Sequence, residues 1–109
     1  MTKRGQFVTV VVAGDYGKPR PALVVQSNLF AELPSFVVCP LTTTLRDDAD
    51  LLRIPVDPSP VNGLRQLSQI AVDKITVVPA SKIGNTIGTA DDVLMLRVNR
   101  ALALLIGLA

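Results

Sequence analysis

The architecture of the chain is constrained most strongly by the segment Lys18-Pro19-Arg20-Pro21-Ala22-Leu23-Val24-Val25. Proline fixes its own backbone and pushes the residue before it out of the helical region, so Lys18 and Arg20 are both held extended. The apolar run that follows is typical of a strand covered on both faces. Because a guanidinium is not buried unpaired, we expect Arg20 to stay at the end of the sheet. The segment therefore predicts a positioned cation at a sheet rim.

A second apolar run, Phe36-Val37-Val38-Cys39-Pro40-Leu41, predicts a strand that releases three hydroxyls, Thr42, Thr43 and Thr44, at its C-terminal end. The residues between the two runs, 27–34, are too few for the usual parallel crossover, so the strands should be antiparallel if they pair. In an antiparallel pair the start of one strand lies beside the end of the next. Arg20 and Thr42 are thus expected to share one end of the sheet.

The remaining pattern predicts one mainly β domain over residues 1–109, with a C-terminal helix. Short apolar segments between Pro- and Gly-rich turns favour a small barrel. The expected strands cover residues 7–12, 21–26, 35–41, 52–56 and a longer 67–78, with one helical turn near 80–83.

The last helix should begin at Thr89 or Ala90, with Thr89 as the capping residue. Its apolar residues at helical spacing are predicted to cover the barrel: Leu94, Val98, Ala101, Leu102, Leu105 and Leu108. Four further apolar residues point elsewhere and suggest a second contact surface, with a dimer mate as the first expectation: Val93, Leu96, Leu104 and Ile106.

Composition excludes several kinds of site. The chain has no histidine, which rules out His-dependent triads and His-ligated zinc, and its one cysteine, Cys39, reads as an inert core thiol rather than a nucleophile. A net charge of +2 is compatible with nucleic-acid binding but does not establish it.

No signal-like or membrane-spanning segment is evident, which predicts a cytoplasmic protein. A hydrophobic content of 49% is high for a lone small domain and suggests a partner subunit.

Four segments in order resemble the MazF/PemK family of bacterial toxins over nearly the whole chain. They are Arg4-Gly5-Gln6, Arg20-Pro21-Ala22-Leu23-Val24-Val25-Gln26, Val37-Val38-Cys39-Pro40-Leu41-Thr42 and the terminal Leu104-Leu105-Ile106-Gly107-Leu108. The resemblance implies a small, strongly curved SH3-like barrel of the MazF/PemK/CcdB type, usually a homodimer. It implies the toxin of a type II toxin-antitoxin system, with a cognate antitoxin and metal-independent, sequence-specific cleavage of single-stranded RNA without a cofactor.

The same resemblance assigns catalytic positions. Arg20 falls on the family's catalytic arginine, Thr42 on its catalytic threonine, and Asp73 on the acidic position of the fifth strand. This chain has Ala71 and Thr76 where relatives carry arginines. Asp73 is the best base available to take the proton from the ribose 2′-hydroxyl, although a structural acid paired with Lys74 or another neighbour is nearly as good an interpretation.

Substrate positioning is expected from residues around the same rim. The candidate RNA-binding residues are Tyr16, Lys18, Thr43, Arg46 and Arg65. The cations suit phosphates, and Tyr16 could stack on an unpaired base or pack back onto its own loop.

Two alternatives come from other functional classes. Residues 73–84 are similar to a segment of the CcdB gyrase poison, but the chain ends Ile106-Gly107-Leu108-Ala109 and contains none of the tryptophan that CcdB-like chains use against gyrase. The second alternative is a catalytically silent binding module, for which the missing arginines near Asp73 are the best argument.

Overall fold

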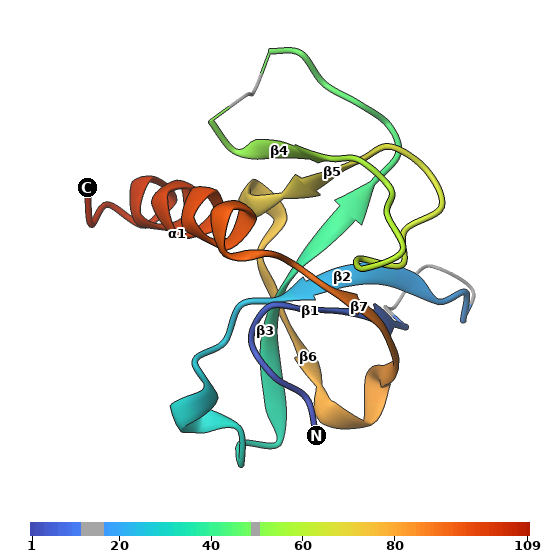
Figure 1. The fold of residues 1–109 in the computed structure, drawn as a ribbon. Coiled ribbons are helices and arrows are strands. Elements are labelled where there is room, and N and C mark those ends of the chain that lie inside the picture. Colours follow the sequence, from blue (N-terminus) through green and yellow to red (C-terminus); the bar gives the residue numbers. More distant parts are fainter. Residues whose placement is uncertain (12–16, 49–50) are drawn as a thin grey trace.

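The computed structural model describes residues 1–11, 17–48 and 51–109, and these form seven strands, three short 3-10 turns and one α-helix (Figure 1). The elements are, in order, β1 (Gln6–Val10), β2 (Arg20–Val24), η1 (Asn28–Phe30), β3 (Ser35–Thr42), β4 (Arg53–Val56), β5 (Ser68–Ala71), η2 (Val72–Lys74), β6 (Thr76–Pro79), η3 (Ala80–Lys82), β7 (Ile83–Thr89) and α1 (Asp92–Leu105). The predicted mainly β fold with a C-terminal helix is confirmed.

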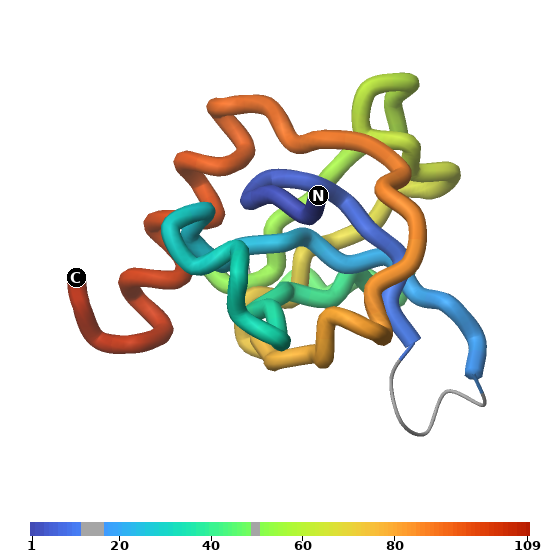
Figure 2. The backbone as a smooth tube through the Cα atoms, turned by 90° about the horizontal axis from the view of Figure 1, so that it is seen from below, coloured from blue at the N-terminus to red at the C-terminus, as the bar shows by residue number. Residues whose placement is uncertain are grey.

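All strand pairs are antiparallel, in the order β4-β5-β3-β2-β1-β7, and β6 also pairs with β3. Figure 2 shows the N-terminal strand lying between the chain segments of β2 and β7, its two partners. The predicted antiparallel pairing of β2 with β3 is confirmed, with Ala22 opposite Pro40 and Val24 opposite Val38. These two strands occupy the middle of the sheet.

Both faces of the central strands are buried, as the continuous apolar runs predict. One face, including Phe7, Leu23 and Cys39, packs against β4, β5 and the helix residues Val98 and Ala101. The opposite face, including Val8 and Val24, forms a second cluster with residues from β3, β6 and β7. Side chains alternate along each strand, so Arg20 belongs to the second face and Pro21 to the first.

The predicted strand over residues 67–78 is wrong in its continuity. It is broken by η2 into β5, which pairs with Leu41 and Thr42, and β6, which pairs with residues 35–38 of the same strand. Because β3 is eight residues long, it can pair with both strands along one edge, and the turn between them lets β5 also pair with β4. The helical turn near residue 80 is confirmed as η3.

The strand β7 has no counterpart in the sequence prediction. Its segment, IGNTIGT, is too rich in glycine and polar residues to show an apolar alternation. Its glycines instead allow neighbouring groups to come close to the β7 backbone. A Cβ at Gly84 would lie 2.5 Å from the Thr9 hydroxyl oxygen, and one at Gly88 would overlap the backbone of Asn62. Without a partner strand at this edge, β1 would leave its backbone groups unpaired.

The terminal helix covers the first face of the sheet largely as predicted. Its capping residue is Asp91, whose carboxylate accepts a hydrogen bond from the Leu94 amide at 2.8 Å. The predicted capping residue, Thr89, instead ends β7. Val98 and Ala101 are buried, but Leu108 lies beyond the helix end and is exposed. The four apolar residues expected on other faces are all exposed, namely Val93, Leu96, Leu104 and Ile106.

Candidate active site

Arg20 and Thr42 share one end of the β2–β3 pair, as the sequence predicts. β2 begins at Arg20 and the antiparallel β3 ends at Thr42, and continuing the register from Ala22 opposite Pro40 by two residues would bring both side chains to the same face. The backbone of each is also held on its outer side, because Arg20 pairs with Val10 of β1 and Thr42 pairs with Gln69 of β5. A guanidinium and a hydroxyl are therefore presented together from a rim that is paired on both sides.

The Thr42 hydroxyl is oriented by the turn that follows it. Its Oγ1 accepts a hydrogen bond from the Thr44 amide at 3.0 Å. A hydroxyl that accepts from one side still carries its own O–H, which it donates in another direction. The local structure thus keeps the oxygen in place and leaves Thr42 with a proton to donate to an anion.

Asp73 is paired with a neighbouring cation, Arg53. It lies in η2, after β5 has ended, and its carboxylate accepts from the Arg53 guanidinium through two hydrogen bonds of 2.6 and 3.1 Å. The Arg53 side chain is 7% exposed and that of Asp73 29% exposed. These hydrogen bonds lower the pKa of Asp73 from its usual 3.8, against the opposing effect of partial burial. The expected position of Asp73 within a strand is corrected, and of the two partners left open, Lys74 or another neighbour, it is another neighbour, Arg53.

This ion pair lies away from Arg20 and Thr42. Thr42 pairs with Gln69, and Asp73 follows four positions later, beyond the end of β5, which is on the order of 10 Å along the chain. Arg53 stands opposite Ala71 in the β4–β5 register. A guanidinium therefore does reach Asp73, although it comes from the neighbouring strand and not from position 71. No sequence pattern points to Arg53, because only the strand register brings it to Asp73.

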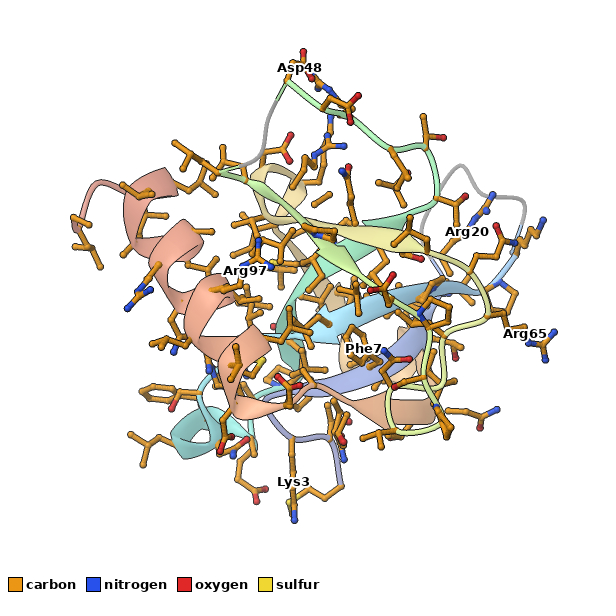
Figure 3. All side chains as sticks on the ribbon, turned by 45° about the horizontal axis from the view of Figure 1, so that its top comes forward. Lys3, Phe7, Arg20, Asp48, Arg65 and Arg97 are labelled. Atoms are coloured by element: carbon orange, nitrogen blue, oxygen red, sulfur yellow. The ribbon has the colours of Figure 1, made fainter. Side chains whose placement is uncertain are left out.

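Three of the predicted RNA-binding residues gather around one hollow beside the rim. Lys18, Thr43 and Arg65 line a pocket of about 640 Å³, which we call the rim pocket. In Figure 3, Arg20 and Arg65 lie on the same side of the molecule, remote from Arg97 on the helix. Tyr16 lies outside the described residues.

Arg46 is held separately, in the loop after β3. Its backbone N–H donates to the side-chain oxygen of Gln69 at 3.0 Å, and its carbonyl accepts from the same amide group at 2.9 Å. Its guanidinium pairs with Asp48 at 3.0 Å, and this hydrogen bond raises the pKa of Arg46 and lowers that of Asp48. Both side chains are well exposed, so the ion pair is weak and a phosphate can compete for Arg46.

Buried polar side chains that are not among the predicted site residues hold the loops around the rim. Gln69 holds the loop after β3 through its hydrogen bonds to the Arg46 backbone. Asn62 holds the loop between β4 and β5 through hydrogen bonds to backbone groups of that loop. Ser68 donates to the Gln66 carbonyl at 3.0 Å. The one available signal was Gln69 directly before the apolar residues 70–72 of the predicted strand. Every buried side-chain nitrogen or oxygen in the described part of the chain has a partner.

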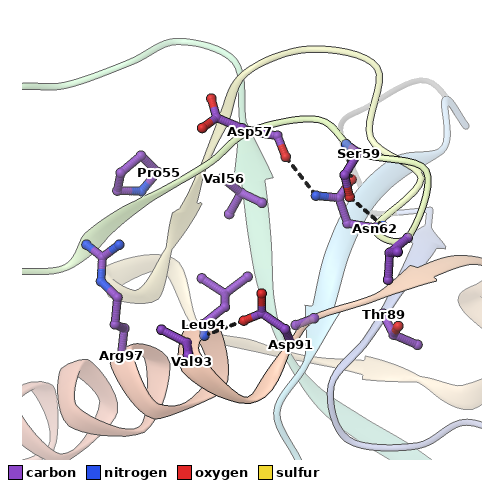
Figure 4. A pocket seen from close by; sticks show the side chains of 12 residues that line it. Pro55, Val56, Asp57, Ser59, Asn62, Thr89, Asp91, Val93, Leu94 and Arg97 are labelled. Atoms are coloured by element: carbon purple, nitrogen blue, oxygen red, sulfur yellow. Dashed lines mark hydrogen bonds between the residues drawn. The ribbon is translucent and has the colours of Figure 1, made fainter.

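A second hollow, of about 330 Å³, lies between the β4–β5 loop and the start of α1 (Figure 4). Its lining includes two carboxylates, Asp57 and Asp91, with Arg97 as the cation. Asp91 is engaged in capping the helix. Two carboxylates beside one guanidinium do not favour a polyanion, so we do not place RNA here.

Other candidate chemistry is absent from the described residues. Cys39 is fully buried, and burial raises the pKa of its thiol to about 12, which fits the predicted inert core thiol. Residues 1–11, 17–48 and 51–109 contain no group of three or more His, Cys, Asp or Glu side chains able to hold a metal ion. Within the same ranges, α1 and the short turns all fall short of what a bilayer crossing demands.

Comparison with known proteins gives consistent matches over almost the full length. The family model of PemK-like, MazF-like toxins of type II toxin-antitoxin systems matches residues 3–106. A protein of Mycolicibacterium smegmatis named probable endoribonuclease MazF is 40% identical over 108 residues, which cover 98% of each chain.

Solved structures agree with the sequence match. An endoribonuclease in complex with its cognate antitoxin, from a mycobacterial species, superimposes with a TM-score of 0.82 at 25% identity and covers 100% of this chain and 98% of that one. The Mycobacterium tuberculosis toxin MazF-mt6 gives a TM-score of 0.79 at 25% identity and covers 94% of this chain and 96% of that one. The matches support the MazF/PemK interpretation over the CcdB alternative, and the chain belongs to the family of PemK-like, MazF-like toxins of type II toxin-antitoxin systems.

Proposed function

We propose that this protein is a toxin that acts as a metal-independent endoribonuclease on single-stranded RNA. The observation that carries the proposal is that β2 begins at Arg20 where the antiparallel β3 ends at Thr42, next to a pocket lined by Lys18 and Arg65. The 40% identical relative named as a probable endoribonuclease supports the same activity. A cytoplasmic location follows from the proposal, because its RNA substrate is there.

The reaction is attack by a ribose 2′-hydroxyl on the adjacent phosphorus. A new P–O2′ bond forms and the P–O5′ bond breaks, while the 2′-hydroxyl releases its proton to solvent water and the leaving O5′ takes one up from solvent, which leaves a 2′,3′-cyclic phosphate and a free 5′-hydroxyl. Negative charge builds on the non-bridging oxygens, where the forked Arg20 guanidinium donates hydrogen bonds and remains charged throughout. Thr42 donates its O–H to the same oxygens. Loss of one preorganised donor of this kind typically costs about 10²- to 10³-fold in rate.

We assign Asp73 a structural rather than a catalytic role. Its carboxylate is engaged by Arg53 through two hydrogen bonds, and the resulting low pKa makes it a weaker base. It also lies four positions beyond Gln69, the residue that pairs with Thr42, and outside β5. Its expected task is to neutralise Arg53 and hold the turn between β5 and β6.

Two protein partners complete the proposal. A cognate antitoxin with an acidic segment would be drawn to the cationic rim, in keeping with the related endoribonuclease solved together with its antitoxin. A second copy of the chain would cover the apolar outer face of α1, where Val93 is 73% and Leu96 is 50% exposed.

The test is cleavage of a long single-stranded RNA in EDTA by the parent, by Arg20→Ala and by Arg97→Ala. Arg97→Ala removes the same charge from the remote face of the molecule and is the matched control. We expect cleavage by the parent and the control, and a loss of at least 100-fold in Arg20→Ala at a temperature where its unfolding curve shows that it is folded. Gyrase inhibition without RNA cleavage would favour the CcdB alternative, and neither activity would favour the silent binding module.

A further inference from the structure

The rim pocket lies directly across the sheet end from Arg20 and Thr42. Pro21 and Thr43 line it, and each is the next residue in the chain after one of the proposed catalytic pair. Because side chains alternate along a strand, Pro21 faces away from Arg20. A group that entered the pocket would therefore lie on one side of the rim while a phosphate attached to it reached the other.

The lining of this pocket combines an apolar floor with a cationic edge. The floor includes Pro21, Leu64 and Ile87, of which the last two come from the β4–β5 loop and from β7. Lys18 and Arg65 supply two cations, and no carboxylate is among the described lining residues. Gln66 adds an exposed amide that can both donate and accept. The volume of about 640 Å³ falls within the usual range for ligand pockets.

The loop that forms one wall is built to be rigid. The buried Asn62 side chain accepts from the Ser59 and Leu64 amides and donates to the Asp57 carbonyl, at 2.8 to 3.0 Å. Gly63 has a φ of +71°, and a Cβ there would overlap the Ile87 carbonyl, so the loop rests directly on the β7 backbone. Ser68 fixes the carbonyl of Gln66. A pocket with so many fixed backbone positions is preorganised for one shape of occupant.

Resting on the proposed function, we infer that the rim pocket is a subsite for one unpaired nucleobase next to the cleaved phosphate and that it selects the RNA sequence that is cut. A nucleobase has a flat apolar face for the floor and a polar edge for Gln66, while its flanking phosphates meet Lys18 and Arg65. An acidic peptide would satisfy the cations but leave the apolar floor without a flat partner. Leu64 and Gln66 are thus specificity-determining residues.

The inference is tested first by binding, with cleavage blocked. Four short RNA oligonucleotides that differ at a single base, each carrying a 2′-deoxy sugar at the cut position, are titrated against the parent, Gln66→Ala, Leu64→Ala and Gln6→Ala by fluorescence anisotropy. Gln6→Ala is the matched control, because Gln6 lies at the end of β1 opposite to the rim. We expect the parent to prefer one base by about 10-fold, and Gln66→Ala to lose that preference while Gln6→Ala keeps it.

Cleavage mapping supplies the second measurement and separates the two proposals. On a long RNA, sequencing of the new 5′-hydroxyl ends should show Gln66→Ala cutting a broader set of sites than the parent. Equal base preference in parent and Gln66→Ala would overturn the subsite while leaving the nuclease standing. If the parent does not cut RNA, the proposed function fails, and the binding measurement still decides the subsite.

Two controls protect the interpretation. Gln66 is exposed, so Gln66→Ala should melt at the parent's temperature even if Leu64→Ala does not. If both variants leave base preference unchanged and weaken only the binding of poly-glutamate, the pocket is a protein-docking site and the inference is wrong.

Discussion

Asp73→Asn is the substitution that best separates a structural carboxylate from a catalytic base. The change keeps the size of the side chain and removes its charge, which leaves the Arg53 guanidinium, only 7% exposed, without a counter-ion. Breaking a buried pair from one side costs about 3–5 kcal/mol, and the 29% exposure of Asp73 argues for about 3 kcal/mol here. That is a large part of the roughly 5–15 kcal/mol that stabilises a typical domain. The melting temperature should fall by on the order of 12 °C.

The pH dependence of this effect has a definite sign. The folded-state pKa of Asp73 is lowered by Arg53, so the pair contributes its full stabilisation above the unfolded-state value near 3.8. As the pH falls below that value the unfolded chain takes up the proton first, and the contribution is lost as the pH passes through the lower folded-state pKa. The stability difference between parent and Asp73→Asn should therefore be largest near neutrality and shrink under acid.

Urea unfolding at several pH values measures this difference, and cleavage of RNA well below the melting temperature measures activity. We expect Asp73→Asn to be unstable but to retain most of its activity per folded molecule. The double variant Arg53→Met with Asp73→Leu should be more stable than Asp73→Asn and recover much of the stability that Asp73→Asn loses, because both charges of the pair are then absent. The reasoning is refuted if Asp73→Asn unfolds like the parent at neutral pH and cuts RNA more than 100-fold more slowly.

Two further predictions concern the fold. Gly63→Ala should lower stability by about 3 kcal/mol, because it adds a clash with Ile87 to an unfavourable positive φ, whereas Gly107→Ala, with φ +81° and open space, should cost only about 1 kcal/mol in the same urea experiment. Cys39 should react with a thiol reagent only after unfolding, since its thiol is buried and its pKa is raised to about 12; labelling of the native protein as fast as of the urea-unfolded chain would contradict its buried placement.

The central part of the fold was predictable because its signals are local. The proline-bounded run after Arg20 and the apolar run before Thr42 both read as strands covered on two faces, and the short connection between them allowed antiparallel pairing alone. These facts were enough to bring the two side chains to one sheet end. Residue order and type along some twenty positions carried all the information that this step required.

The rest was settled by contacts between distant parts of the chain. β7 is a strand because β1 needs a partner at this edge, and because Gly84 leaves room for the Thr9 hydroxyl of β1 and Gly88 for the loop at Asn62, not because its own residues favour strands. Arg53 meets Asp73 through the β4–β5 register, and the loop that walls the rim pocket rests on β7, where Gly63 meets the Ile87 backbone. By itself, the amino-acid sequence determined which segments had to be buried and which cation had to stay at the rim. Only the tertiary structure decided which charges neutralise one another and what shape surrounds that cation, because these depend on strand register and packing rather than on local preference.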